Sequence, residues 1–400
     1  MSAKPKFFGS WTEDYTYLQS VILREWRLVC THKIYWVGMI IAPLTTLVFM
    51  LTLMSNGLPS HLPLAVVDLD QTYISRELIR NLDAFEQTQV VMHASDFNEA
   101  RLAMQRGEVY GIILLPERFA AKAITGKQPV ITYYTNNNYM MGGSLLFRDL
   151  KMISEMASAA VGVAVGVELG QDIGQILGRV MPIKVDPYVM GNPWLNYSIY
   201  LNNMVIPGIL SLLIMQLTVY SIGVEIKKRT SREWLVCAGG SIYTALLGKL
   251  IVHTAIYMLV GVCCLSVLYG WAGFPLQSGW GPMLLALLLL ILSSEALGIL
   301  FISLIPILRL GLSLASLFGM LAFSISGFSF PVTAMYPPIQ SLTLLFPLRH
   351  YFLIYADQAL NGYPLIYSWK PYLCLILLTL LPLLNIRNLR DELLLVKYIK

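Results

Sequence analysis

The sequence predicts an α-helical multi-span membrane protein, with six transmembrane helices and an external α/β (α+β) domain inserted between spans one and two. Three observations carry this prediction. The chain is 56% apolar and only 13% charged, and its mean hydropathy is +0.64, which is too hydrophobic for a soluble globular protein. Apolar runs of roughly 20 residues, the length that crosses hydrocarbon, recur along the chain. The long segment 55–203 instead alternates strand-like and helix-like patterns, as α/β domains do.

Charge and cysteine usage agree with a membrane protein. The formal net charge of +5 suits Lys and Arg gathered on cytoplasmic loops and gives no argument for a nucleic-acid partner. The five cysteines lie in or beside apolar or cytoplasmic stretches, so no disulfide framework is expected.

Residues 1–33 are expected to form a cytoplasmic N-terminus without a cleavable signal peptide. Within 15–33, several apolar residues and Glu25 fall near one helical face, whereas Arg24 and Arg27 lie largely elsewhere. With Trp26 embedded in it, this pattern predicts an amphipathic helix on the membrane surface. The alternative is an ordinary polar lead-in to a span. The first span is expected at 34–54, and its basic flank places the N-terminus in the cytoplasm.

The inserted domain is expected to contain four strands, at 62–70, 88–93, 109–115 and 129–134. Helices are expected between them, at 73–85, 95–106 and 116–126, with Ser95 as the N-cap of the second. A long or broken helix should follow over 144–180. Asp68 and Asp70 allow an acidic site, but capping of the turn after the first strand is the favoured interpretation.

Five further spans are expected within 204–386, at 204–224, 241–269, 282–305, 310–330 and 371–386. The loop at 270–281 has no Lys or Arg and belongs outside, whereas the loop at 306–309 and the tail at 387–400 carry bases and belong inside. This assignment leaves both termini in the cytoplasm.

The segment 225–240, between the second and third spans, is predicted to be a cytoplasmic docking element for a partner. It combines bases, acids and one tryptophan, and it ends in a glycine pair. Its candidate contact residues are Glu225, Lys227, Lys228, Arg229, Arg232, Glu233 and Trp234. The alternative is that this basic loop only fixes the topology of the two spans.

Between 332 and 370, prolines interrupt short apolar helices that cannot cross a bilayer. Such pieces fit an external re-entrant or interfacial segment.

The sequence lacks the motifs for nucleotide binding and for metal binding. Neither Gly126-Lys127 nor Gly248-Lys249 is followed by Ser or Thr, so there is no Walker A sequence. No His-Glu-x-x-His and no zinc-spaced cysteine pair occurs, so no metal site and no catalytic residue is predicted. Glu295 is an acid inside a predicted span, which is a functional candidate by default. The alternative, a hydrogen bond that packs two helices, has equal weight. His253 is interpreted as structural.

The order of these parts resembles the membrane subunit of ABC exporters of the type-2 permease family, over most of the chain. The surface helix matches at Leu23-Arg-Glu-Trp-Arg27, and Pro43 lies early in the first span. The first strand of the inserted domain matches at Ala65-Val-Val-Asp-Leu-Asp70. The basic segment matches through Glu225, Lys228-Arg229-Thr230, Glu233 and Gly248-Lys249. The last part reads Phe330-Pro331, Met335-Tyr-Pro337, Phe346-Pro-Leu348 and Leu360-Asn-Gly362, where many relatives have Met-Pro in place of Met-Tyr-Pro-Pro.

The resemblance implies two permease subunits, identical or similar, with a separate ABC ATPase subunit below each. ATP and magnesium would bind to the ATPase and no cofactor to this chain. The segment from Glu225 to Trp234 and the surface helix, with Arg24, Glu25, Trp26 and Arg27, would couple to the ATPase, and Trp234 would fill a pocket in it. The external motif residues are Phe330, Pro331, Met335, Pro337, Pro347 and Gly362.

The resemblance also implies ATP-driven export of a lipophilic or amphipathic substrate from the bacterial inner membrane, where the chain contacts lipid. The periplasmic domain suggests a membrane-fusion adaptor outside. A polysaccharide or glycolipid export permease is one alternative, although such relatives usually lack so large a domain. A membrane enzyme or sensor without transport is the other. The sequence shows neither a cluster of acids and histidines nor a cytoplasmic output domain to favour it.

Overall fold

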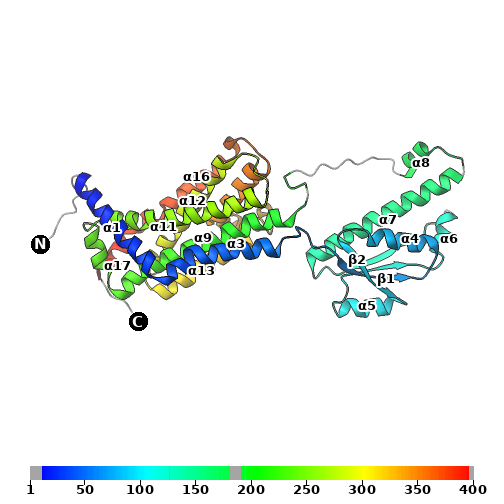
Figure 1. The fold of residues 1–400 in the computed structure, drawn as a ribbon, viewed down its shortest axis with the longest axis horizontal. Helices are drawn as coiled ribbons and strands as arrows, with labels where there is room; N and C mark the ends of the chain where they lie inside the picture. Colours follow the sequence, from blue (N-terminus) through cyan, green and yellow to red (C-terminus); the bar gives the residue numbers. More distant parts are fainter. Residues whose placement is uncertain (1–10, 126, 169, 181–190, 194, 396–400) are drawn as a thin grey trace. The chain divides into compact units, whose positions relative to one another are not determined.

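The computed structural model describes residues 11–125, 127–168, 170–180, 191–193 and 195–395. The chain divides into two compact units. Met1–Ser55 together with Val189–Lys400 form a helical unit, and Asn56–Tyr188 form a unit built on a sheet. The element order is drawn in Figure 1.

The helical unit begins with α1 (Trp11–Thr31), the predicted surface helix. Then α2 (Lys33–Tyr35), the π-helical turn η1 (Trp36–Ile41) and α3 (Ala42–Leu53) form one apolar stretch. Next come α9 (Tyr197–Lys228), α10 (Ser231–Cys237), α11 (Ile242–Leu265) with η2 (Ser266–Trp271), α12 (Trp280–Leu304) and α13 (Leu308–Ile325). The C-terminal part is made of shorter pieces: η3 (Val332–Ala334), α14 (Pro337–Leu342), η4 (Thr343–Leu345), α15 (Pro347–Ile354), η5 (Tyr355–Leu360), η6 (Leu365–Ser368), α16 (Trp369–Leu380), η7 (Leu381–Leu384) and α17 (Ile386–Leu395).

Seven helices of the described chain are long and apolar enough to span a membrane. Six overlap the six predicted spans, with bounds that differ by up to seven residues: Lys33–Leu53, Tyr197–Lys228, Ile242–Trp271, Trp280–Leu304, Leu308–Ile325 and Leu365–Leu384. The seventh, Met140–Val167, lies in α7 of the sheet unit. There Leu146, Leu150 and Ile153 belong to the core that covers the sheet, so we assign α7 to the inserted domain.

The centre of the helical unit is the packing of α9 on α12, the two most buried candidate spans. Gly298 makes this approach close, because a Cβ there would lie 2.7 Å from the Cβ of Thr218 and 2.9 Å from the carbonyl oxygen of Met215. A hydrogen bond of 2.7 Å between the hydroxyls of Ser211 and Ser294 joins the same two helices. Small residues at such contacts let helix backbones approach in a bilayer.

The second span begins earlier than the sequence predicted. Helix α9 starts at Tyr197 rather than near residue 204, because Asn196 caps it by accepting from the backbone N–H groups of Ser198 and Ile199. Asn202 and Asn203, the polar residues that directly precede the predicted start, lie buried inside the helix. The domain predicted over 55–203 therefore extends too far, since residues 197–203 belong to the helical unit.

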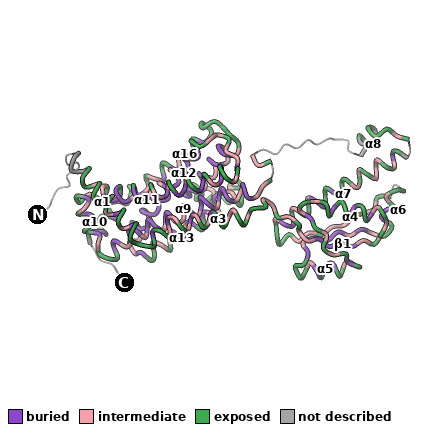
Figure 2. The backbone as a smooth tube through the Cα atoms, viewed as in Figure 1, coloured by how far each residue is buried: buried purple, intermediate pink, exposed green. Residues whose placement is uncertain are grey.

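The sheet unit contains β1 (Leu62–Asp68), α4 (Tyr73–Asp83), β2 (Thr88–Ala94), α5 (Phe97–Gln105), β3 (Gly111–Leu115), α6 (Phe119–Ile124), β4 (Thr132–Thr135), α7 (Met140–Glu168) and α8 (Ile173–Val180). The strand order is β2-β1-β3-β4. Strands β2 and β3 pair parallel to β1, and β4 pairs antiparallel to β3. The middle of β1 is buried (Figure 2), because helices cover both faces of the sheet.

The two faces have separate cores. Leu64, Val66 and Ile113 pack with α4, α6 and α7 on one face, while Ala65, Val67 and Ile112 pack with α5 on the other. The predicted strands and short helices are present with bounds shifted by up to three residues. The N-cap prediction for Ser95 was wrong: Asp96 accepts from the N–H of Glu99 at 2.8 Å. The backbone N–H and hydroxyl of Ser95 instead donate to the Glu99 carboxylate.

Candidate functional site

The acids after β1 stabilise turns. Asp68 accepts from the backbone N–H groups of Asp70 and Gln71, each at 3.0 Å, and from the Ser75 hydroxyl at 2.7 Å. Asp70 accepts from the Thr72 hydroxyl and from the N–H of Ala120, in the first turn of α6. This is the turn-capping role that the sequence favoured, and it occupies both carboxylates.

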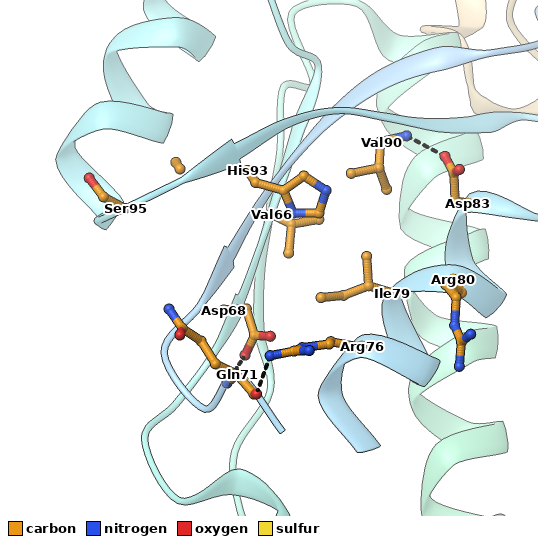
Figure 3. A pocket seen from close by; sticks show the side chains of 11 residues that line it. Val66, Asp68, Gln71, Arg76, Ile79, Arg80, Asp83, Val90, His93 and Ser95 are labelled. Carbon is orange, nitrogen blue, oxygen red and sulfur yellow. Dashed lines mark hydrogen bonds between the residues drawn. The ribbon is translucent and has the colours of Figure 1, made fainter. Parts of the chain in front are cut away.

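A surface hollow of about 660 Å³ lies beside these turns, between α4 and the edge strand β2. In Figure 3, Arg76 points to the backbone oxygen of Gln71, to which it donates at 3.1 Å. The Asp83 carboxylate receives the N–H of Val90 at 2.7 Å. The two acids that line this hollow, Asp68 and Asp83, therefore both accept hydrogen bonds from groups of the same domain. No group of three or more potential metal ligands occurs in the described residues.

Three of the residues predicted to couple to a partner, Arg24, Glu25 and Glu225, lie in a buried group of charges in the helical unit. We call Arg24, Glu25, Glu225, Lys249 and His253 the charge cluster. Arg24 and Glu25 come from α1, Glu225 from the end of α9, and Lys249 and His253 from α11. Two acids thus meet two permanent bases, and three elements that are distant in sequence are held together by their side chains.

Glu25 lies at the centre of the cluster and is fully buried. Lys249 donates to its Oε2 atom at 2.7 Å, and Nε2 of His253 lies 2.9 Å from its Oε1 atom. Both of its oxygens therefore have partners. Burial by itself would raise the pKa of the Glu25 carboxyl, but the charge of Lys249 and the hydrogen bond with His253 outweigh it and lower that pKa to about 2.

Arg24 and Glu225 form a second pair within the cluster. The two Nη atoms of Arg24 donate to the two carboxylate oxygens of Glu225, at 2.7 and 2.9 Å. Such a bidentate pair fixes direction as well as distance. The Thr230 hydroxyl also donates to Glu225, and the Nζ atom of Lys249 lies 4.0 Å from it. Because Lys249 reaches both acids, the two pairs form one network.

Close packing holds α1 in place beside this network. At Gly248, an added Cβ would lie 2.7 Å from the Cβ of Val21, so only glycine leaves room for α1 to contact α11. The Ser20 hydroxyl donates to the backbone oxygen of Cys237 at 2.8 Å, which joins α1 to the end of α10. The predicted amphipathic helix therefore rests on α10 and α11, with Trp26 and Arg27 exposed.

The segment predicted as a loop at 225–240 is mostly helical. Glu225, Lys227 and Lys228 end α9, and Arg229 adopts a left-handed conformation (φ +62°) whose N–H caps that helix. Helix α10 follows at once. Lys227, Lys228, Arg229, Arg232 and Glu233 are exposed, and we call the four bases among them the basic surface.

The prediction that Trp234 fills a pocket in a partner was wrong in its geometry. The indole is fully buried within the chain, and Lys249 lies 5.0 Å from its ring centroid. Glu225 is also buried. Both side chains therefore act beneath the basic surface, where a cation over an aromatic face is favourable.

Glu295 lies outside this cluster, buried on α12. The Thr254 hydroxyl of α11 donates to its Oε2 atom at 2.7 Å, while Oε1 has no hydrogen-bond partner among the described residues. The contact has the form of the helix-packing hydrogen bond that was one of its two interpretations.

The external motif residues do not gather into a site. Phe330, Pro331, Pro337 and Gly362 are exposed, Met335 is half-buried and only Pro347 is buried. Gly362 has φ +65° and turns the chain after η5. That π-helical turn is fixed by backbone hydrogen bonds from Gln277 to Ala359 and from Ser278 to Gln358.

The role of Lys249 and His253 as partners of Glu25 is what sequence reasoning missed. Lys249 was noted only as part of a family pattern, and His253 only as structural. The available signal was their spacing, because residues four apart share one helix face. Two bases on one face of a helix call for an acidic partner, and Glu25 is an acid on the otherwise apolar face of α1.

The pKa of Glu25 leads to a prediction of pH dependence. Because the folded pKa is depressed to about 2, the stabilisation is fully present above the ordinary carboxyl value of about 4.3 and is lost as pH falls through 2. Hydrogen exchange of α1 should stay constant from pH 8 to 5 after correction for intrinsic rates, and α1 should then loosen at lower pH. The shift corresponds to about 3 kcal/mol. In a Glu25→Gln variant this acid transition should shrink and leave the contribution of Glu225, whose pKa is lowered, against the effect of burial, by its hydrogen bond with Arg24. A transition of undiminished size in that variant would contradict the assignment.

Comparison with known proteins agrees with this architecture. The model of the ABC-2 family transporter proteins matches residues 33–385. No curated protein matches the chain. The family match runs from the first span through α9, α11 and α12 to the end of the last span, and it includes the inserted sheet domain. The chain therefore belongs to the ABC-2 family of transporter proteins and is a multi-pass membrane permease component without ATPase motifs.

Proposed function

We propose that this chain is the permease subunit of an ATP-driven exporter that moves a lipophilic or amphipathic substrate out of the cytoplasm or the inner leaflet. A separate ABC ATPase, which the family implies, binds ATP and magnesium. The permease pairs with a second permease subunit in the bacterial inner membrane, with both termini in the cytoplasm. The sheet domain then lies on the periplasmic side, where it is available to an adaptor of the membrane-fusion class.

The observation that carries this proposal is the charge cluster beneath the basic surface. The exposed bases Lys227, Lys228 and Arg229 end α9, while Glu225 on the same turn is bound to Arg24 of α1. A push on the basic surface therefore reaches α1 through Arg24 and α11 through Lys249. Such an arrangement converts contact with a partner into movement of the surface helix α1 and of the span α11.

The basic surface suits an acidic partner. Its cations are exposed, and complementary charge across an interface speeds encounter and excludes wrong partners. The position of these residues at the ends of spans is the position that cytoplasmic bases take.

The test is association of the full-length permease with its ATPase in native membranes, after cross-linking and solubilisation. Lys227→Glu, Lys228→Glu and Arg229→Glu are combined, and Trp234 is left intact because it is buried. We expect association to fall by at least about tenfold, since juxtaposed like charges cost several kcal/mol.

The matched control carries the same change in charge on the sheet domain, through Arg101→Glu, Arg106→Glu and Lys122→Glu. All three positions are exposed. This control should bind the ATPase as wild type does. If wild-type protein brings down no protein with nucleotide-binding motifs, the proposed function fails.

A further inference from the structure

Helix α17 was predicted only as part of a cytoplasmic tail, yet the structure builds it into the cytoplasmic end of the helical unit. Leu389 and Leu393 are fully buried in the same apolar cluster as Trp234 and Leu235 of α10. The Ser231 hydroxyl donates to the backbone oxygen of Leu393 at 2.7 Å, and Arg232 donates to that of Leu394 at 3.3 Å. These contacts fix α17 against α10.

A hollow of about 530 Å³ lies where α1, α10 and α17 meet. Its apolar wall comes from Tyr17, Leu235, Val236 and Leu394, with Gly239 and Gly240 completing the lining. Both glycines have positive φ, +65° and +79°, and the Tyr17 ring fills the space beside Gly239, where an added Cβ would lie 2.8 Å away. The hollow is thus preformed and bounded by three elements.

The charged groups that line the hollow are both basic. Arg232 of α10 and Arg390 of α17 border it, and both are exposed. The acids of α10 and α17, which are Glu233, Asp391 and Glu392, are not among its lining residues. Val236 is 75% exposed on the wall. An apolar depression bordered by two guanidinium groups suits an apolar side chain with carboxylates beside it.

We propose that this hollow is a docking socket for the ABC ATPase, and that it receives an apolar side chain of the ATPase flanked by acidic residues. The inference rests on the proposed function and extends it, because it adds α17 to the contact surface. Charge and continuity select this occupant. Arg232 belongs both to the basic surface and to the socket, so a partner that covers one reaches the other.

The consequence is that one inserted side chain would touch all three elements at once. Tyr17 belongs to α1, whose Arg24 and Glu25 enter the charge cluster, and Val236 belongs to α10, which carries Trp234 beneath Lys249. Binding at the socket therefore acts on both sides of the charge cluster.

The experiment places a photo-cross-linking amino acid at Val236 of the full-length permease in native membranes, and the cross-linked peptides are then sequenced. We expect an adduct on an apolar residue of the ATPase that has Asp or Glu close to it in sequence. An adduct only with lipid, or with a second copy of the permease, would overturn the socket.

A matched pair of variants on α17 tests the charge. Arg390→Glu changes a lining residue, whereas Arg387→Glu makes the same change on an exposed residue that does not line the hollow. We expect Arg390→Glu to weaken ATPase association by about tenfold or more, and Arg387→Glu by less than about twofold. Equal effects of the two would contradict the proposal.

The cross-link identifies an acidic residue of the ATPase. Replacing that residue by Lys should restore binding to the Arg390→Glu permease. One outcome would reject the socket and keep the proposed function. In it, the ATPase binds wild type and is lost when Lys227, Lys228 and Arg229 are changed to Glu, but Arg390→Glu has no effect on binding and Val236 gives no cross-link to the ATPase. If no ATPase binds wild type, the proposed function itself fails.

Discussion

Replacing Lys249 by Met should lower the free energy of unfolding of the permease by about 3–5 kcal/mol, the usual cost of removing one partner from a buried ion pair. Glu25 would then be left buried and charged, with only His253 as a partner. The methionine fills most of the volume of the lysine stem, so the loss reports the charge and not a cavity. The measurement is the unfolding midpoint of purified protein in lipid nanodiscs.

Neutralising the acid as well should recover much of this loss. In the double variant Glu25→Gln with Lys249→Met, no buried charge is left unpaired at this position, and the glutamine oxygen can still accept from His253. Lys228→Met serves as the control, because Lys228 is exposed and surface substitutions usually change stability by less than about 0.5 kcal/mol. A double variant less stable than Lys249→Met alone would show that the pair is not the source of the effect.

Arg24→Glu should uncouple the permease from its ATPase without releasing it. The substitution places a carboxylate where a guanidinium now donates two hydrogen bonds to Glu225, so the end of α9 and α1 repel each other. Losing one partner of a buried charge pair costs about 2–5 kcal/mol. We expect permease-stimulated ATP hydrolysis to fall by at least about tenfold, while association, which depends on the exposed bases, stays close to wild type.

The control for this variant lies three residues further along the same helix. Arg27→Glu makes the same change in charge on an exposed side chain and should leave hydrolysis nearly unchanged. The exchanged pair Arg24→Glu with Glu225→Arg should recover part of the activity. Recovery stays incomplete because the arginine at position 225 would place a second cation near Lys249, whose Nζ atom now lies 4.0 Å from the Glu225 carboxylate. Loss of ATPase association in Arg24→Glu would contradict the separation between binding and coupling.

The spans and the sheet could be predicted because their signals are local. An apolar run of about 20 residues defines a span whatever surrounds it, and the β1 pattern ending at Asp68 defines a strand and its turn. Helix α9 was predicted to start too late because Asn202 and Asn203 are polar. Asn203 is satisfied inside the fold, because its side-chain oxygen accepts from the Tyr269 hydroxyl at 2.9 Å, a contact that depends on tertiary structure. The amide nitrogen of Asn202 donates to the Ser198 hydroxyl one helical turn earlier.

The charge cluster shows the limit of such reasoning. The sequence grouped Glu25 with apolar residues on one face of α1, but its partner Lys249 is 224 residues away, and no local pattern links the two. The sequence likewise placed Trp234 in an exposed docking loop, since it lies among charged residues. Tertiary packing of α17 and α11 around α10 buries it, and that packing is not encoded in the composition of the segment.

Distance measurement between spin labels during ATP turnover tests most directly whether the charge cluster transmits movement. One label is placed at Gln19 on α1 and one at Tyr243 on α11, both exposed, to report the distance between the two helices that the charge cluster joins. A third label at Arg309, at the start of α13, provides a reference. The exposed cysteines Cys30 and Cys263 are first replaced by serine. With the ATPase bound, addition of ATP and vanadate should leave the Gln19–Tyr243 distance unchanged while the distance from each to Arg309 shifts. A Gln19–Tyr243 distance that changes with nucleotide would contradict the claim that α1 and α11 move as one body.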